Sequence, residues 1–422
     1  MYGNDLRIRE RPNADITMRI AFFTDTYLPA RSGMEISIES FRTALEDMGH
    51  ELYVFTPTMH GYKDENKNVY RFRSVRMIRK PEMRLAFPWG SVDSSVRKIR
   101  DIPFDVVHVH SPFTMGLLGR YIAQKQNVPL LFTNHCHHTE YAKIYFRERI
   151  VLPYTAEKWV KWFSNQADRV IAPSSKFKEL LQGYGVIRPI DIVQTGIEPS
   201  LFATTEETER VAQALRARYN IPRSAHAFVY VGRMSDEKNV MYLIEAFARL
   251  EKNNPDTYMF FVGEGKARER YEETAKELGV RNAIFTGAVR HEDIPTYYHA
   301  ADAFLFASLT DTQGIVILEA MASGLPVVAL RDGALIDVIH HKENGFLLDV
   351  KATPETFAAQ VENLLKDETG YRRLSVNALT TATKFTEKKM AEQLAVIYEG
   401  LVTARTLRHA AASHVPARQE VA

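Results

Sequence analysis

The sequence has a single cysteine, Cys136, among 422 residues. One cysteine cannot form a disulfide within the chain, so the fold must rest on its hydrophobic core, and a chain of this length can bury a sizeable one. Such sparing use of cysteine is typical of a reducing compartment. We therefore expect a cytoplasmic protein.

Long apolar runs and signal-like segments are lacking too. No apolar run approaches the roughly 18 residues that cross a bilayer. The first 17 residues are charged and contain no apolar stretch, unlike a secretory signal. We expect residues 1–17 to be a disordered extension and the fold to begin at Met18. An excess of one charge is also missing, since the net charge is +2, so we expect no nucleic-acid partner.

Short apolar runs alternate with helix-period segments from Met18 onward. Ile38, Phe41 and Leu45 recur at spacings of three and four, which is typical of one helix face. Strands separated by helices favour a parallel sheet that is covered on both faces. The predicted strands are 19–25, 52–57, 105–110, 129–134 and 169–173 in the first half, and 227–233, 258–265, 283–287, 303–308 and 326–330 in the second.

A break in this pattern sets the domain boundaries. The alternation restarts after residue 202, so the sequence predicts an α/β protein with two doubly wound, Rossmann-like domains that face each other across a cleft. Ligands of such sheets bind beyond the carboxyl ends of the strands. We place the first domain at 18–200, the second at 201–386, a final helix at 387–405 and a disordered tail at 406–422.

The strongest polar pattern is LTDTQGIVILEAMASGLPVV, residues 309–328. Gly314 opens a helix that carries Glu319, eight positions after Asp311. The start of a helix attracts diphosphates through its free N–H groups, and carboxylates placed there would hold sugar hydroxyls. The alternative is that Asp311 or Thr312 simply caps the helix.

A second pattern, VGRMSDEKN, places Arg233 and Lys238 in a loop between a strand and a helix. This loop should overhang the same cleft. Arg offers a fork to two phosphate oxygens and Lys a point charge, which would stabilise a departing nucleoside diphosphate. A solvated basic loop is the alternative, but two such patterns in one domain argue against coincidence.

These segments resemble the retaining family-4 glycosyltransferases, which have the two-domain GT-B fold, and the resemblance extends from Met18 to about residue 400. It implies a transferase that moves a hexose from a UDP-glucose or GDP-mannose type of donor to an acceptor hydroxyl, with the donor on the second domain. Arg233 and Lys238 then bind the diphosphate, Glu319 the ribose, and Asp311, which replaces the usual Glu, the hexose. The resemblance also assigns Gln313, Gly314 and Ile315 to the donor hexose site.

The first half carries the same resemblance. Gly33 matches a glycine of the family's first loop, although a usual neighbouring glycine is here Ser32. His135, in FTNHCHHTEY, matches a histidine beside the transferred sugar, so the catalytic set is His135, Arg233, Lys238 and Asp311. A metal site in the run 135–138 and a buried structural histidine remain alternatives. Weaker matches assign to the nucleotide the turn that begins at Gly263 and to the base the backbone of Val289.

Two further expectations concern cofactors and the acceptor. No two aspartates stand two positions apart, so the Asp-x-Asp metal clamp of the other main glycosyltransferase fold is missing, and we expect no metal and no cofactor. Basic and aromatic residues mix in 70–89 and 158–163, which suits an anionic membrane surface on the inner face of the cell membrane. The first segment resembles members that glycosylate lipids such as diacylglycerol. A surface loop with an amphipathic helix, a soluble acceptor, an epimerase of similar fold, and donor binding without catalysis are the alternatives.

Overall fold

A computed structural model describes residues 17–30, 32–77, 80–86, 99–137 and 151–413. Most of the predicted disordered segments, 1–16 and 414–422, lie outside the described residues. The expectation of a disordered tail from residue 406 is wrong for its first part, because helix α14 (Glu387–Ser413) continues through it. None of the helices in the described ranges combines the length and the apolar character that a bilayer crossing requires.

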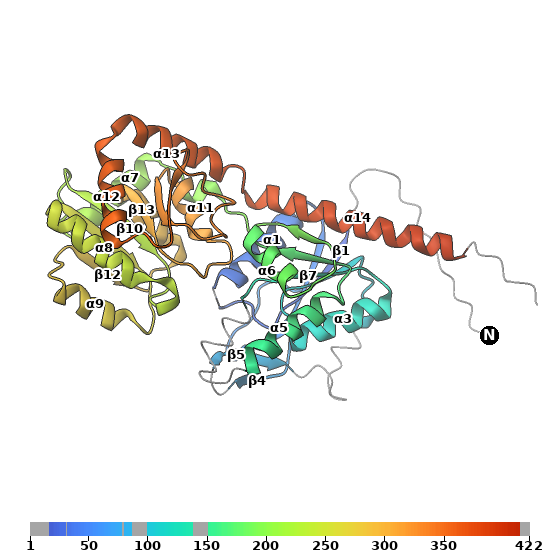
Figure 1. The fold of residues 1–422 in the computed structure, drawn as a ribbon. Coiled ribbons are helices and arrows are strands. Elements are labelled where there is room, and N and C mark those ends of the chain that lie inside the picture. The colour runs from blue at the N-terminus through green and yellow to red at the C-terminus, as the bar shows by residue number, and fades with distance from the viewer. Residues whose placement is uncertain (1–16, 31, 78–79, 87–98, 138–150, 414–422) are drawn as a thin grey trace, which may run out of the picture.

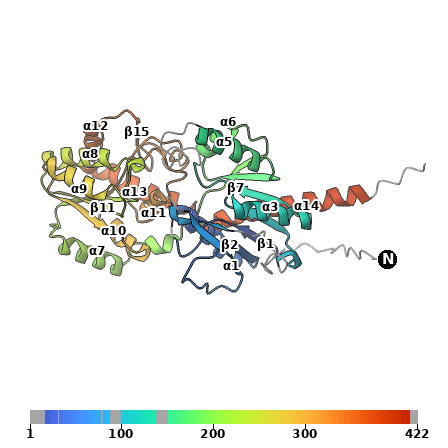
Figure 2. The same cartoon turned by 90° about the horizontal axis from the view of Figure 1, so that it is seen from below.

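Two parallel sheets, each with helices on both faces, form the two halves of the molecule (Figures 1 and 2). The strand order is β3-β2-β1-β6-β7-β8-β9 in the first sheet and β12-β11-β10-β13-β14-β15 in the second. The predicted α/β fold with two doubly wound domains is therefore confirmed. The first sheet comprises β1 (Arg19–Phe23), β2 (Glu51–Pro57), β3 (Val69–Phe72), β6 (Val106–Val109), β7 (Leu130–Thr133), β8 (Arg169–Ala172) and β9 (Ile190–Ile192). The second comprises β10 (His226–Val231), β11 (Thr257–Val262), β12 (Ala283–Gly287), β13 (Ala303–Phe306), β14 (Val327–Leu330) and β15 (Gly345–Leu348).

The strands read as apolar runs because both faces of each sheet are covered. All residues of β13 and β14 are buried, and the first sheet lies between two separate hydrophobic clusters. The covering helices of the first domain are α1 (Gly33–Asp47), α3 (Thr114–Gln126), α5 (Val151–Ser164) and α6 (Ser175–Gly183). Those of the second are α7 (Glu206–Arg218), α8 (Val240–Asn253), α9 (Arg268–Glu277), α10 (Ile294–His299), α11 (Ile315–Ala322), α12 (Pro354–Lys366) and α13 (Glu368–Ala382).

The order of the strands reverses once in each sheet, and each reversal marks a crevice. The chain moves from β1 outward to β2 and β3, then returns to β6 on the other side of β1. The second sheet repeats this step between β10 and β13. Ligands of doubly wound sheets bind at such switch points, outside the carboxyl ends of the strands.

The basic segment 70–89 is not a plain surface loop over its described part. Antiparallel strands β4 (Ser74–Met77) and β5 (Lys80–Ala86) form a hairpin there. Arg71 is committed to internal contacts, because its Nε and Nη2 donate to the carboxylate of Asp64 at 2.7 and 2.8 Å. Part of the predicted basic patch is therefore structural.

Helix α14 leaves the second domain and packs on the first (Figure 1). Its apolar face is buried against β1 and α1, and Tyr398 Oη lies 2.6 Å from His108 Nδ1, in hydrogen-bond contact. The chain passes from the first domain to the second near Ile197 and returns near Phe385. The two segments are joined there by a hydrogen bond from Ile197 N–H to Phe385 O at 2.9 Å. Gly196 is required at this crossing because a Cβ there would lie 2.5 Å from the backbone of Glu387.

Replacing Tyr398 with phenylalanine should lower the free energy of unfolding by about 1–3 kcal/mol, because the buried His108 Nδ1 would lose its partner. Urea unfolding measures the difference. Val396→Ala is the control, since this side chain of the same helix is 67% exposed and its loss should cost less than about 0.5 kcal/mol. Equal stability of Tyr398→Phe and the parent protein would contradict the assignment.

Candidate functional site

Two of the predicted site residues follow the strands at the switch point of the second sheet, and His135 follows a strand next to the switch point of the first. Arg233 follows β10 and Asp311 follows β13, while His135 follows β7 on the facing domain. Contacts across the cleft bring the two edges together. A Cβ placed on Gly33, at the start of α1, would have Ile315 Cδ1 at 4.0 Å as its nearest neighbour, at the start of α11.

The centre of the second-domain edge is a partly buried ion pair. Lys238 Nζ lies 2.5 Å from Asp311 Oδ1, and the two side chains are 17% and 14% exposed. Burial disfavours the charged form of Asp311, but the attraction of Lys238 outweighs it, and the pKa of Asp311 lies below its ordinary value. The capping alternative is wrong for Asp311, because Gly314 is the N-cap of α11 and no side chain caps that helix.

Three buried oxygens around this pair lack hydrogen-bond partners within the described ranges: Asp311 Oδ2, Ser308 Oγ and Ser235 Oγ. Ser308 lies close enough to favour the charged form of Asp311, but not in a good hydrogen-bond geometry. Buried polar atoms are nearly always paired, because an unpaired one costs about 1–3 kcal/mol. Three in two adjacent loops indicate a place where a polar ligand binds.

Arg233 stands at the open side of the same site. Its side chain is 52% exposed, and Nη2 lies 3.4 Å from Glu237 Oε1. An ion pair this long and exposed contributes little stability. Tyr230 holds the backbone instead, donating from its hydroxyl to Arg233 O at 3.1 Å.

The side chain of Glu319 is buried inside the second domain and does not lie at the open surface of the site. It is 4% exposed, and Tyr298 Oη donates to its Oε2 at 2.7 Å. Burial raises the pKa of Glu319, although the hydrogen bond from Tyr298 opposes the rise. The predicted contact with a ribose would therefore replace or share this internal hydrogen bond.

The predicted glycines differ in what requires them. At Gly314, φ is +77° and a Cβ would lie 2.9 Å from Leu335 Cδ2, so the start of α11 needs glycine. At Gly263, a Cβ would lie 2.0 Å from Gly232 O. The close approach of the loops after β10 and β11 explains that glycine without a ligand. Val289 is half-buried and packs on the second-domain core.

The start of α1 already holds a negative charge. The Glu35 carboxylate accepts a hydrogen bond from Ser32 N at 2.8 Å, and it also contacts the Thr26 hydroxyl. This capping explains why serine stands where a second glycine was expected. It also reduces the anion-attracting field of α1 at Gly33, so the loops of the second domain supply most of the positive charge.

His135 is half-buried, and its Nε2 lies 3.0 Å from His110 Nδ1. The fully buried histidines are His108 and His110, whose pKa values burial lowers well below the ordinary range. Sequence reasoning missed both, although alternate positions of one strand share a face. In the part of the chain that the structure describes, no group of three or more His, Cys, Asp or Glu side chains could hold a metal. His138 lies outside that part.

Gln313 connects the donor loop to the interdomain linker rather than to open space. Its Oε1 accepts from Thr195 N and its Nε2 donates to Thr195 O, both at 2.7 Å. Thr195 Oγ1 in turn donates to Ser37 Oγ on α1 at 2.7 Å. Sequence reasoning also missed the N-cap and first turn of α6, residues 174–176, which contact this loop from the first domain.

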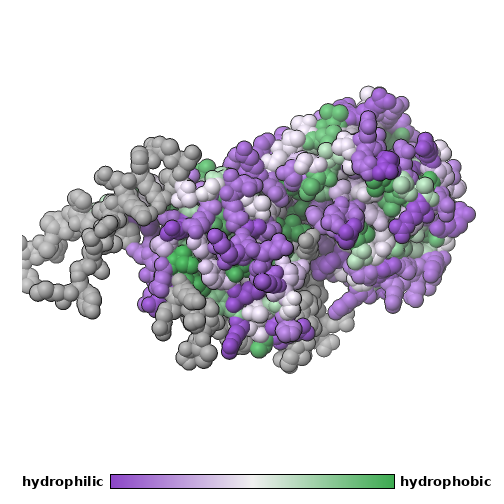
Figure 3. Space-filling view, turned by 180° about the vertical axis from the view of Figure 1, so that it is seen from behind, coloured by the Kyte–Doolittle hydropathy of each residue, from purple (hydrophilic) through white to green (hydrophobic). Residues whose placement is uncertain are grey.

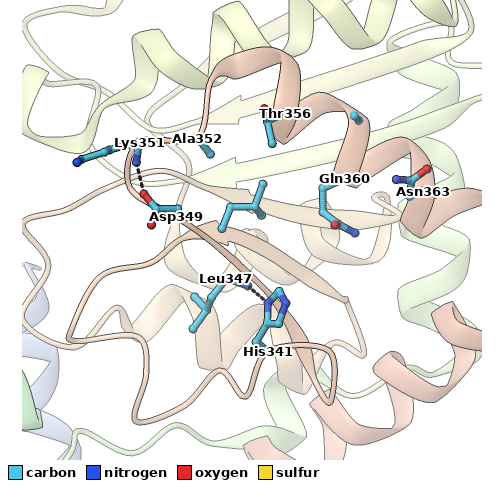
Figure 4. Close-up of a pocket in the computed structure, with 10 residues that line it drawn as sticks. His341, Leu347, Asp349, Lys351, Ala352, Thr356, Gln360 and Asn363 are labelled. Carbon is cyan, nitrogen blue, oxygen red and sulfur yellow. Dashed lines mark hydrogen bonds between the residues drawn. The ribbon is translucent and has the colours of Figure 1, made fainter.

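An evident surface hollow lies elsewhere, between β15 and α12 (Figure 4). Its polar groups are used locally, since Asp349 Oδ1 accepts from Lys351 N and His341 Nδ1 accepts from Leu347 N. We therefore place the site at the switch points and not in this hollow.

Two family descriptions match the chain: "Glycosyltransferase Family 4" over residues 31–201 and "Glycosyl transferases group 1" over residues 211–381. The alpha-monoglucosyldiacylglycerol synthase of Streptococcus pneumoniae is 31% identical over 337 residues, 78% of this chain and 75% of the relative. The GDP-mannose-dependent alpha-mannosyltransferase of Corynebacterium glutamicum is 30% identical over 357 residues, 83% of this chain and 81% of the relative.

Solved structures agree on the fold. Anabaena Alr3699/HepE in complex with UDP superposes with a TM-score of 0.73 at 20% identity, covering 91% of this chain and 100% of that one. Fold and site together define a glycosyltransferase of the GT-B class. The chain belongs to the family-4 glycosyltransferases, and it is a transferase enzyme.

Lys238→Met should invert the pH dependence that Asp311 gives to stability. In the parent protein the depressed pKa of Asp311 contributes stability above its unfolded pKa of about 3.9, and this is lost as the pH falls. Without Lys238, burial dominates and raises the pKa, so stability is lost as the pH rises from about 4.5 to about 7.5.

Urea unfolding at both pH values measures the effect, relative to the double variant Lys238→Met/Asp311→Asn. The double variant lacks the buried carboxylate, so it should be the more stable of the two at the higher pH. If the two variants unfold alike at both pH values, Asp311 is not held as a buried carboxylate by Lys238.

Proposed function

We propose that the enzyme transfers a hexose from a UDP-glucose or GDP-mannose type of donor to the hydroxyl of a membrane lipid such as diacylglycerol, with retention of anomeric configuration. The observation that carries the donor part is the partly buried Lys238–Asp311 pair at the β10–β13 switch point, beside which three oxygens find no hydrogen-bond partner among the described residues. The cations Lys238 and Arg233 suit a ligand that carries two negative charges, such as a diphosphate.

In the proposed reaction the bond between the sugar C1 and the donor phosphate oxygen breaks, and the acceptor oxygen bonds to C1 from the same face. The acceptor proton passes to a phosphate oxygen of the leaving nucleoside diphosphate. Arg233 and Lys238 meet the charge that develops there, so the transfer needs no metal ion. Asp311 and the backbone of 313–315 orient the hexose, and His135 approaches it from the other domain.

The lipid acceptor is supported by the activity of one relative, a monoglucosyldiacylglycerol synthase, and by side chains of α5. Tyr154 and Trp162 are 57% and 40% exposed, and Lys158 Nζ lies 4.2 Å from the Tyr154 ring centroid. Rings and basic heads on one helix suit the interface of an anionic membrane. Phe163 does not belong to this surface, because it is fully buried. On the face seen in Figure 3, apolar side chains form only small groups among hydrophilic ones. A peripheral position on the cytoplasmic side of the membrane follows from this proposal.

Arg233→Ala and Lys238→Ala should each lower turnover at least about tenfold, roughly 1.4 kcal/mol of barrier. The assay offers a panel of nucleotide sugars with lipid and soluble acceptors in the presence of EDTA, and mass spectrometry identifies the product. Arg249→Ala is the matched control, because Arg249 is an exposed arginine on α8 that pairs with Glu355. Normal turnover in both site variants would remove the phosphate assignment, and turnover without an acceptor would indicate an epimerase.

Lys158→Glu/Lys161→Glu should weaken binding to phosphatidylglycerol vesicles by at least about tenfold, because each basic residue near the surface contributes about 1 kcal/mol. Vesicle sedimentation measures the bound fraction. Lys351→Glu/Lys366→Glu, two exposed lysines of the second domain, is the control with the same change of charge. An equal loss in both double variants would show that α5 has no special part in membrane binding.

A further inference from the structure

The first turn of α6, with its N-cap Ser174, contacts the second domain from the first. Ser174 Oγ donates to Thr312 O at 2.7 Å, within the loop that carries Asp311. Ser175 donates from its backbone N–H and its hydroxyl to the two carboxylate oxygens of Asp337, at 2.7 and 2.5 Å. These contacts join residues more than 130 positions apart, and they bridge the cleft beside the proposed donor site.

Lys176 makes the charged contact of this turn. Its Nζ donates to Leu309 O at 2.9 Å and to Asp332 Oδ2 at 2.5 Å. Asp332 is 5% exposed, and its other oxygen accepts from Ala334 N at 2.8 Å. The stem of Lys176 lies close to Gly333, where an added Cβ would come within 3.2 Å of Lys176 Cβ. The ammonium group is therefore seated between the loops that follow β13 and β14.

The surroundings of Lys176 make its charge matter. A half-buried cation that pairs with a buried carboxylate interacts more strongly than a surface pair. The charge of Lys176 also favours the ionised form of Asp311, after the closer Lys238. The carbonyl of Leu309 lies two positions before Asp311. One first-domain side chain thus touches the loop that carries the donor carboxylate and supports its charge.

We propose that Lys176 is a positioning residue, which holds the loop 309–312 in its working arrangement only when the two domains are closed. This inference rests on the proposed donor site. Arg233, Lys238 and Asp311 all belong to the second domain, so the nucleotide binds there without Lys176. In the closed arrangement the first domain brings the acceptor to the donor. Removing Lys176 removes the ion pair with Asp332 that stabilises this arrangement. Turnover should then fall more than nucleotide affinity.

The test compares turnover with nucleotide binding in Lys176→Met. Turnover should fall at least about tenfold while the Kd for UDP or GDP, measured by calorimetry, rises less than about threefold. Lys176→Arg keeps the charge and should recover most of the turnover. Asp332→Asn should reproduce the loss, and adding Asp332→Asn to Lys176→Met should lower turnover little further, because both remove one interaction. Lys178→Met, two positions along the same helix, is the control and should behave like the parent protein.

Small-angle X-ray scattering separates this inference from the proposed function. With UDP or GDP bound, the parent protein should have a smaller radius of gyration than Lys176→Met. This comparison needs only a bound nucleotide, so it stands even if the acceptor is misassigned, whereas failure of the parent protein to bind any nucleotide removes the donor site itself. Unchanged turnover in Lys176→Met overturns the inference. So does a rise in Kd as large as the fall in turnover, which would mean that Lys176 binds the nucleotide directly.

Discussion

The two loops of the proposed donor site are joined by one partly buried attraction, that between Lys238 and Asp311. Each group alone would be too costly to bury, and together they offset much of that cost. The pair joins the loop after β10 to the loop after β13, the two strands between which the order of the sheet reverses. The crevice at the switch point is therefore bounded by two loops, which this ion pair joins together with hydrogen bonds from Asn239 Nδ2 to Ala307 O and from Thr310 Oγ1 to Glu237 O.

The loop that carries Asp311 is held on two sides by residues outside its own sheet. The side chain of Gln313 forms two hydrogen bonds with the backbone of Thr195 in the linker, and the backbone oxygen of Thr312 accepts a hydrogen bond from Ser174 of the first domain. The donor loop is thus a shared part of both domains, although its sequence belongs to the second. This explains how a site made of second-domain residues can respond to the position of the first domain.

Much of the fold and part of the site could be predicted because the signals are local. Apolar runs marked the strands, and Arg233, Lys238 and Asp311 lie in loops that each follow one run. Gly263 was assigned to the nucleotide, but the packing of two neighbouring loops requires it. Lys176 gave no local signal, because its partners come from other elements, whereas the alternation of His108 and His110 indicated a shared face but not what the two side chains contact. Predicted strands ran past their observed ends where polar loop residues follow the buried run, as in 258–265 against 257–262 for β11.

The return of α14 to the first sheet has a consequence for how the chain matures on the ribosome. The cover that buries β1 and α1 on one face is translated well after the elements that it covers. At about 5–20 residues per second, the stretch between the end of β9 and Tyr398 takes on the order of 10–40 seconds to make. During that interval the apolar face of β1 and α1 lacks this helix, and transiently exposed apolar surface of this kind promotes aggregation.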